Sequence, residues 1–157
     1  MPNPALPGRH QVTASLSIDA PAAETWAVVA DFFNMHTWAP GISATEPLTD
    51  ATTGIGAARR NVAEGFGAID QTITDWTEGR GYVYASGAVG PFARAHTAYS
   101  IEEVDGATRA SISMGFDLVP PMDTPEKAPM VRSKLEGSLG PLLDALKRRV
   151  ETGERVR

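Results

Sequence analysis

A polar side chain inside an apolar strand pattern is the first candidate for a chemical role. Gln71 has the same parity as Ile69 and Ile73, which places its amide on the apolar face of a strand predicted over 67–76. An unpaired buried amide is costly, so Gln71 must bond a neighbouring group, a water molecule or a ligand. A glutamine side chain donates and accepts hydrogen bonds, but it is uncharged and has no titratable proton. Its chemistry is therefore limited to hydrogen bonding.

Two adjacent arginines offer a positive charge that could meet an oxygen anion. Arg59 and Arg60 lie in one predicted strand, so they point to opposite faces, and the pattern does not decide which one is inside. An inward arginine would suit a carboxylate or phenolate oxygen. The alternative is an ion pair on a solvated face with one of three nearby carboxylates, Glu64, Asp70 or Asp75. Both interpretations stay open at this point.

Phenol groups form a third set of candidates. With Ile101 facing inward in its predicted strand, Tyr99 faces inward too, and Tyr82 and Tyr84 share one face of the strand over 80–88. Buried tyrosines either point their hydroxyls at a ligand or satisfy them within the protein, and the sequence leaves both open. The three histidines show no metal-ligand spacing, and no phosphate-binding loop or nucleophile motif is present. No metal and no cofactor is expected.

The elements that must position these groups follow from hydrophobic periodicity. Residues 11–18 alternate between apolar and polar, as a strand with one solvated face does. Pro21 then opens a helix, and a second short helix is expected over 33–38. Six more strands follow between turn residues, at 42–49, 55–64, 67–76, 80–88, 94–104 and 107–119. Neighbouring strands joined so tightly are expected to be antiparallel.

The last predicted element is a long helix over 128–151. Its apolar stripe consists of Met130, Leu135, Leu139, Leu142, Leu146 and Val150. Pro141 removes the hydrogen bond to the carbonyl of Gly137, which predicts a bend. Two short helices cannot cover seven strands, so the long helix is expected across the same face of the sheet. A coiled sheet meets one helix closely at one end only, which predicts a cavity between them.

Composition and charge narrow the function classes. Hydrophobic residues make up 42% of the 157 residues, as in a globular domain, and no apolar run approaches the about 20 residues of a membrane-spanning helix. A net charge of −5 disfavours nucleic acid as a partner. The chain has no cysteine and no signal-peptide pattern, so a cytoplasmic location is the default expectation. The expected organisation is a flexible arm over 1–9, one domain over 10–151 and a tail over 152–157.

Several short motifs, taken together in their order along the chain, form a pattern that is typical of one protein family. The first are Ser17-Ile18-Asp19-Ala20-Pro21, Glu24-Thr25-Trp26, Ala30-Asp31-Phe32 and Trp38-Ala39-Pro40. Later ones are Gly56-Ala57-Ala58-Arg59, Gln71-Thr72-Ile73-Thr74-Asp75-Trp76 and Gly106-Ala107-Thr108-Arg109. Over residues 11–150 the set resembles the START-like superfamily, also called Bet v 1-like, helix-grip or SRPBCC, and within it the polyketide cyclase/dehydrase-like branch. The resemblance implies an α+β helix-grip fold: a seven-stranded, curved antiparallel sheet wrapped around a long C-terminal helix, with two short helices after the first strand.

The resemblance also bears on which side chains face a ligand. It favours Arg59 over Arg60 as the inward arginine and puts Tyr82 and Tyr84 on the inner face. Together with strand parity, it gives as catalytic candidates Arg59, Gln71 and Tyr84. The candidate ligand-binding residues are Trp38, Tyr82, Tyr99, Met114, Phe116, Met130 and Leu139. Related bacterial proteins often have glutamate at the position of Gln71. If relatives transfer a proton there, this chain cannot do so, because a glutamine side chain has no titratable proton.

Two functions follow as expectations, because members of the superfamily range from ligand carriers to aromatising cyclases. In the first, the chain binds a small hydrophobic or aromatic molecule, polyketide-like or lipid-like, between the sheet and the C-terminal helix. In the second, it is a cofactor-independent polyketide cyclase, aromatase or dehydratase that folds its substrate and stabilises enolate charge. A protein-interaction role is a third class, and the sequence leaves open whether the chain forms a homodimer.

Overall fold

The computed structural model describes residues 6–154 of the chain. The elements are β1 (His10–Ile18), α1 (Ala22–Val29), the 3₁₀ helix η1 (Phe32–Thr37), β2 (Ile42–Pro47), β3 (Ala58–Ala63), β4 (Gly67–Thr77), β5 (Gly81–Ser86), β6 (Phe92–Val104), β7 (Ala107–Leu118) and α2 (Ala128–Thr152). The order of strands and helices is the predicted one. The strand predicted over 55–64 begins only at Ala58, because residues 53–56 form a turn in which Ile55 is exposed.

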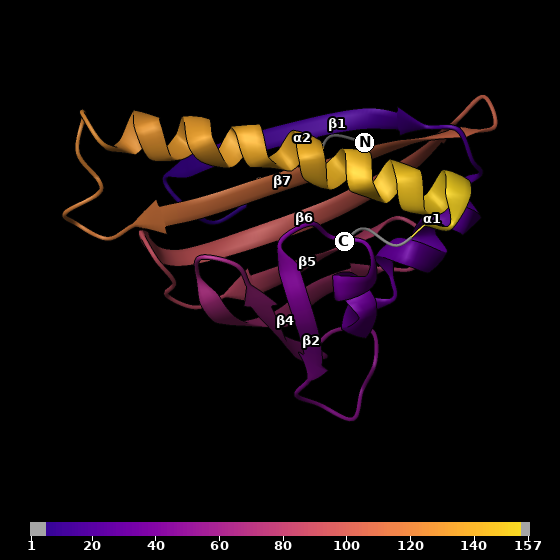
Figure 1. The fold of residues 1–157 in the computed structure, drawn as a ribbon, viewed down its shortest axis with the longest axis horizontal. Helices are drawn as coiled ribbons and strands as arrows, with labels where there is room; N and C mark the ends of the chain where they lie inside the picture. Colours follow the sequence, from indigo (N-terminus) through magenta and orange to yellow (C-terminus); the bar gives the residue numbers. More distant parts are fainter. Residues whose placement is uncertain (1–5, 155–157) are drawn as a thin grey trace.

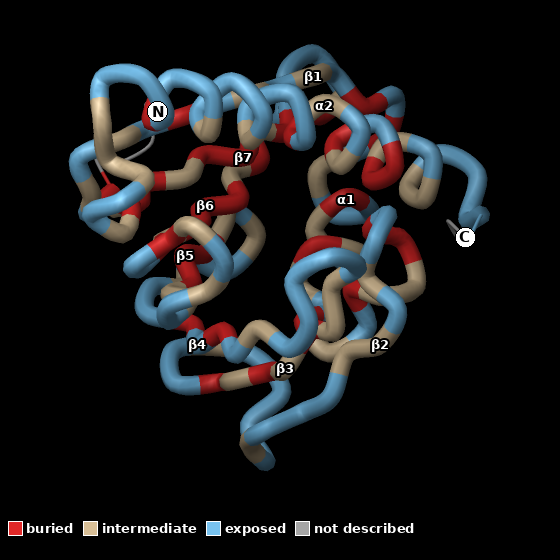
Figure 2. The backbone as a smooth tube through the Cα atoms, turned by 60° about the vertical axis from the view of Figure 1, so that its left-hand side comes forward, coloured by how far each residue is buried: buried red, intermediate tan, exposed pale blue. Residues whose placement is uncertain are grey.

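All seven strands form one antiparallel sheet in the order β1-β7-β6-β5-β4-β3-β2. The strands from β2 to β7 follow one another through the sheet, and β1 pairs with β7 at the far edge (Figure 1). The sheet curves around α1 and α2 (Figure 2), and η1 lies against β2 and β3 on the same side. The predicted α+β architecture, a curved antiparallel sheet around a long C-terminal helix, is confirmed.

The helix α2 packs along β1 and turns one stripe of its surface toward the sheet (Figure 1). Leu139, Leu143 and Leu146 are buried in that stripe, and the helix continues through Pro141 as a single element. The prediction that Met130 lines the interior is wrong, because 71% of Met130 is exposed. Met130 precedes Leu139 by nine residues, and at about 100° per residue the two side chains lie on opposite sides of the helix.

The residues before β1 lie against the outer face of the sheet. Of the flexible arm expected at this end, residues 1–5 lie outside the described residues. Leu6 is buried together with Val83 and Ala98, whose side chains point away from α2. The side-chain amide of Gln11 donates a hydrogen bond to the Leu6 carbonyl at 2.8 Å. The part of the arm that the structure describes is therefore packed against the sheet.

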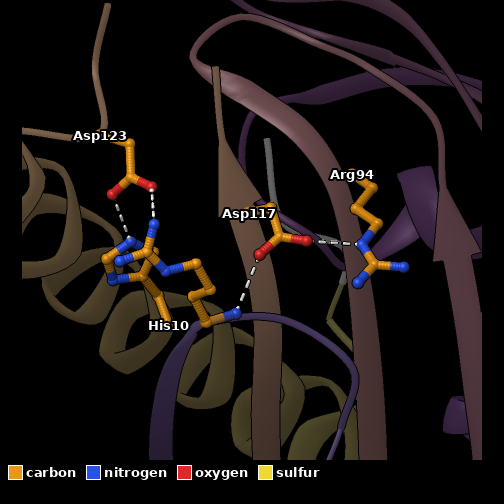
Figure 3. A network of polar contacts seen from close by, with 5 residues as sticks. His10, Arg94, Asp117 and Asp123 are labelled. Atoms are coloured by element: carbon orange, nitrogen blue, oxygen red, sulfur yellow. Dashed lines mark hydrogen bonds and ion pairs between the residues drawn. The ribbon is translucent and has the colours of Figure 1, made fainter. Parts of the chain in front are cut away.

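An ionic network joins the start of β1 to the end of β7 and to the connection that follows it (Figure 3). Asp117 accepts a hydrogen bond from the backbone amide of Arg9 at 2.9 Å and another from Nε of Arg94 at 2.6 Å. These bonds, the one from Arg9 first, lower the pKa of Asp117. Asp123 accepts from Nη1 of Arg9 at 2.8 Å and contacts Nε2 of His10 at 3.0 Å. The connection between β7 and α2 is thus tied to β1.

The Gly115→Ala variant should displace the packed N-terminal segment. A Cβ at position 115 would lie 2.5 Å from the carbonyl oxygen of Pro7 and 2.7 Å from the Cβ of Leu6. We expect the free energy of unfolding, measured by urea denaturation, to fall by about 1–3 kcal/mol, the usual cost of overpacking. Gly87→Ala is the matched control, because nothing lies within 4 Å of a Cβ there. Equal unfolding free energies for the two variants would contradict the packed segment.

The stability of the protein should depend on pH through His96. This residue lies on the outer face of β6, where burial, and then the charge of Arg94, lowers its pKa below the ordinary 6.5. The unfolded chain binds the proton more readily, so the contribution of His96 to stability is full above about pH 6.5 and is lost as the pH falls through the lower folded pKa.

We therefore expect His96→Gln to flatten the decrease in unfolding free energy between about pH 7.5 and about pH 5. Urea denaturation at a series of pH values measures this decrease in the variant and in the wild type. Parallel curves for the two proteins would show that His96 has the same pKa folded and unfolded.

Candidate functional site

A buried arginine is the centre of the candidate site. Arg59 in β3 and Gln71 in β4 are register partners, so their side chains emerge next to each other on the same face. Nε of Arg59 donates to Oε1 of Gln71 at 2.8 Å, and Nη1 donates to the backbone carbonyl of Phe32 in η1 at 2.8 Å. Only 1% of Arg59 is exposed, and Gln71 is buried as strand parity predicted. The inward arginine is Arg59.

Arg60 points to the opposite face and makes the surface ion pair that was the alternative for either arginine. Its Nε lies 2.7 Å from Oδ1 of Asp70, and its Nη2 lies 3.1 Å from Oδ2. Both side chains are exposed, and the hydrogen bond from Arg60 lowers the pKa of Asp70. Adjacent arginines thus have different partners: a carboxylate on the outer face and neutral oxygens on the inner face.

Asn61 belongs to the site, and the sequence analysis missed it. It follows Arg59 by two residues in β3, so it shares the inner face, and it is fully buried. Its Nδ2 donates to Oε1 of Gln71 at 3.0 Å, and its Oδ1 accepts a hydrogen bond from Oγ1 of Thr45 at 2.8 Å. The amide oxygen of Gln71 therefore accepts two hydrogen bonds. Strand parity would have found Asn61 once Arg59 was assigned to the interior.

The segment from α1 to η1 supplies backbone acceptors to the inner face of the sheet. The helix α1 ends at Val29, and carbonyls in the last turn of a helix have no partner within it. The hydroxyl of Tyr82 donates to the Val29 carbonyl at 2.8 Å, as Arg59 does to the Phe32 carbonyl. Two buried side chains of the sheet thus hold this segment over the site.

Aromatic rings surround the guanidinium. Cζ of Arg59 lies 3.9 Å from the ring centroid of Phe32 and 5.0 Å from that of Tyr84, within the range of cation–π attraction. Tyr82 and Tyr99 continue the set, with ring centroids 5.5 Å apart. Burial raises the pKa of both Tyr82 and Tyr99, so these phenols stay protonated at neutral pH. The site is a cation among neutral aromatic rings.

Two buried polar atoms of the site make no hydrogen bond of standard geometry within residues 6–154. They are Nη2 of Arg59 and the hydroxyl of Tyr99, a residue of which only 3% is exposed. Both residues pack near Tyr84, whose ring centroid lies 6.2 Å from that of Tyr99. Buried polar groups are nearly always hydrogen-bonded, so each exception needs an explanation. Nη2 of Arg59 and the hydroxyl of Tyr99 are therefore the donors of the site that a bound molecule could use.

The other predicted lining residues are part of the apolar core. They are Trp38, Met114, Phe116 and Leu139, and all four belong to the main core cluster or pack against it. Trp38 meets Tyr99 edge-on with ring centroids 6.4 Å apart, which adds it to the aromatic set. Phe116 instead stacks on His10, at 5.3 Å between ring centroids, beside the ionic network. Contact of these side chains with a ligand stays a prediction.

Two surface depressions are lined by other residues. One, of ≈ 330 Å³, lies between α1, η1 and residues 52–53, and the other, of ≈ 270 Å³, lies beside Asp123 and the first turn of α2. Neither is lined by Arg59, Gln71 or Tyr99. Within the described part of the chain, no group of three or more histidine, cysteine, aspartate or glutamate side chains could hold a metal ion. No helix there is long and apolar enough to cross a membrane.

The fold, a curved seven-stranded antiparallel sheet with a long C-terminal helix, is that of a START-like protein of the helix-grip type. The family model described as "Polyketide cyclase / dehydrase and lipid transport" matches residues 9–151, which include every element of the sheet and the whole polar centre. The chain therefore belongs to the polyketide cyclase/dehydrase and lipid transport family. No curated protein sequence matches the chain.

Solved structures share the fold at low sequence identity. A START superfamily protein from Mycobacterium smegmatis has a TM-score of 0.77 and 20% identity, over 90% of this chain and 97% of that chain. A protein from Thermobifida fusca has a TM-score of 0.75 and 22% identity, over 94% and 97%. The structure of Ara h 8.0201 has a TM-score of 0.68 and 18% sequence identity, over 91% of this chain and 98% of that chain. At these identities the likeness shows the fold alone.

Replacing the shared acceptor should destabilise the polar centre. Gln71→Leu leaves Nε of Arg59 and Nδ2 of Asn61 without the oxygen that both use. A buried donor without a partner costs about 1–3 kcal/mol, and more when it is charged. We expect the unfolding free energy in urea to fall by about 3 kcal/mol. Thr72→Val, at an exposed position of the same strand, is the control, and a loss no larger than the control's would contradict the network.

Proposed function

We propose that the chain binds a small hydrophobic or aromatic molecule between the sheet and α2, with Arg59 as the polar anchor. The observation that carries the proposal is the buried guanidinium whose Nη2 has no protein partner, together with the unpartnered hydroxyl of Tyr99. Ligand sites commonly combine apolar walls with a few polar groups that fix orientation. The description of the family, which joins polyketide chemistry and lipid transport, supports the same class of ligand.

The side chains around the guanidinium support an aromatic or otherwise apolar guest. Phe32, Tyr84 and Tyr99 offer ring faces and edges, and Trp38 packs against the last of these. Aromatic rings favour offset or edge-on contacts with a planar molecule. A ligand with a flat apolar body and one oxygen would contact these rings while the oxygen accepts from Arg59.

A polyketide cyclase or dehydratase is the second candidate function. Nη2 of Arg59 would stabilise the enolate charge of the substrate. Gln71 would orient the guanidinium, and Tyr84 would contact the substrate. DynU16, a protein of the dynemicin biosynthetic locus, has a TM-score of 0.69 and 19% identity over 92% of this chain and 48% of its own. Proton transfer is the obstacle, because Gln71 has no titratable proton and burial raises the pKa of Tyr82 and Tyr99. Binding without chemistry is therefore the better-supported function.

The proposed partner is a small molecule. Nucleic acid is disfavoured by the net charge of −5. A cytoplasmic location stays a prediction, and the proposal does not include a homodimer, which the sequence left open.

A ligand screen on the purified protein tests the proposal. Aromatic polyketides, flavonoids, sterols and fatty acids are titrated, and binding is followed by tryptophan fluorescence. Native mass spectrometry detects bound and co-purified molecules. We expect at least one class to bind with one-to-one stoichiometry. A panel without any bound or co-purified molecule would overturn the proposed function.

A pair of variants tests where the ligand binds. Thr97 is buried on the inner face, as the register partner of Tyr84. Thr97→Leu adds volume there and should weaken binding by about tenfold. Thr53→Leu puts the same side chain beside the surface depression next to α1 and should leave binding unchanged. Circular dichroism verifies that both variants fold. Weaker binding by Thr53→Leu with unchanged binding by Thr97→Leu would place the ligand in the surface depression instead.

A further inference from the structure

We infer that the ligand is an anion whose negatively charged oxygen, from a carboxylate or a phenolate, binds Nη2 of Arg59. The inference rests on the proposed function and adds the charge of the ligand to it. It starts from a positive charge that the protein itself leaves unbalanced.

Arg59 carries a positive charge, because a guanidinium is not deprotonated in proteins. Its two acceptors of standard geometry are the amide oxygen of Gln71 and the backbone carbonyl of Phe32, and both are neutral. The phenol of Tyr82, which also interacts with the guanidinium, is neutral too. Among residues 6–154 no carboxylate forms an ion pair with it. Dipoles therefore solvate the charge, and none of them balances it.

Burial makes this imbalance unfavourable. A side chain as buried as Arg59 is screened little by bulk water, and buried charges are normally paired. The rings of Phe32 and Tyr84 attract the cation, but they carry no net charge. A water molecule bound to Nη2 would complete its hydrogen bonding and would leave the charge as it is. An anion satisfies both requirements.

The other ionisable groups near the site do not supply a counterion. Tyr82 and Tyr99 are neutral because burial raises the pKa of each phenol. The charge of Asp31 reaches Tyr82, but Asp31 is exposed and its carboxylate accepts a hydrogen bond from Asn34. The counterion must therefore come from outside the described chain.

The outer face of the same two strands shows what the inner face lacks. Arg60 has Asp70 as its register partner, and Arg59 has Gln71. Each arginine donates through Nε to the side-chain oxygen opposite, at 2.7 Å and 2.8 Å respectively. The two pairs differ in charge, because an amide stands where a carboxylate would complete the pair. An anionic ligand would give Arg59 the partner that Arg60 has within the protein.

The ligand class is therefore an amphipathic monoanion. Its apolar body would contact the rings of Phe32, Tyr84 and Tyr99, and its charged oxygen would accept from Nη2 of Arg59. The unpartnered hydroxyl of Tyr99 is a second donor for the same head group. The net charge of the protein is −5, so a preference for anions would come from this local cation and not from the overall field.

Pairs of probes with the same apolar body, one anionic and one neutral, test the inference on the wild-type protein. Calorimetry at about pH 8.5, where the carboxylates and 4-nitrophenolate are ionised, compares 2-naphthoate with methyl 2-naphthoate, dodecanoate with 1-dodecanol, and 4-nitrophenolate with 4-nitroanisole. We expect the anion of at least one pair to bind at least about tenfold more tightly than its neutral twin. The first two pairs report on carboxylates and the third on phenolates.

The outcomes separate the inference from the proposed function. Equal affinities within every pair that binds would overturn the inference and leave the proposed function intact. The proposed function itself fails only if the wider ligand panel also shows no binding.

Gln71→Glu tests the same point by supplying the missing charge from within the protein. The new carboxylate would pair with Arg59 as Asp70 pairs with Arg60. We expect this variant to lose the preference for anions by at least about tenfold and to melt at a higher temperature. A variant that keeps the full preference would overturn the inference.

Arg59→Met removes the charge and should abolish the preference, with Arg60→Met as the matched control on the outer face. Arg60→Met should keep the preference of the wild type, because its side chain points away from the site. If Arg59→Met does not fold, the wild-type twins and Gln71→Glu decide the question. Loss of the preference in Arg60→Met to the same extent as in Arg59→Met would overturn the assignment to Arg59.

Discussion

The interior of this protein depends on how one guanidinium is held away from water. A charge at 1% exposure is tolerated only where several elements contribute acceptors and polarisable surfaces. Gln71 in β4 and the Phe32 carbonyl in η1 supply the acceptors, and the rings of Phe32 and Tyr84 cover the faces of the cation. The sheet and the α1–η1 segment are therefore joined through the same group that serves as the candidate anchor.

The register of β3 and β4 places successive pairs of facing side chains in two environments, one solvated and one buried. On the solvated face the pairing of Arg60 with Asp70 is an ordinary surface ion pair, of the kind that adds little to stability. On the inner face the pairing of Arg59 with Gln71 leaves a charge and a donor unused. Local imperfections of this kind concentrate at functional sites in otherwise consistent structures. The shared fold of the family does not by itself specify a function, so these few side chains carry the argument.

Much of the fold could be predicted, because strand and helix periodicity are local properties of the backbone. Alternation identified the strands, and it placed Gln71 and Tyr99 on the inner face, where each is buried. The same rule left the adjacent arginines undecided. Val62 has the parity of Arg60, and an apolar residue there argues for an inward Arg60, but its side chain is only half-buried, on the outer face. The choice depended on the pairing of β3 with both β2 and β4.

By itself, the sequence determined the order of the elements, the α+β class and the presence of a polar group in the apolar wall. Tertiary structure alone decided that Asn61 shares the acceptor of Gln71 and that Met130 faces solvent. It also decided that the backbone carbonyls of Val29 and Phe32 accept the hydrogen bonds of Tyr82 and Arg59. These contacts join residues far apart in the chain, and they depend on strand register and on the rotation of a helix about its axis. Neither quantity is encoded in the periodicity of one segment, because both are set by the surface against which that segment packs.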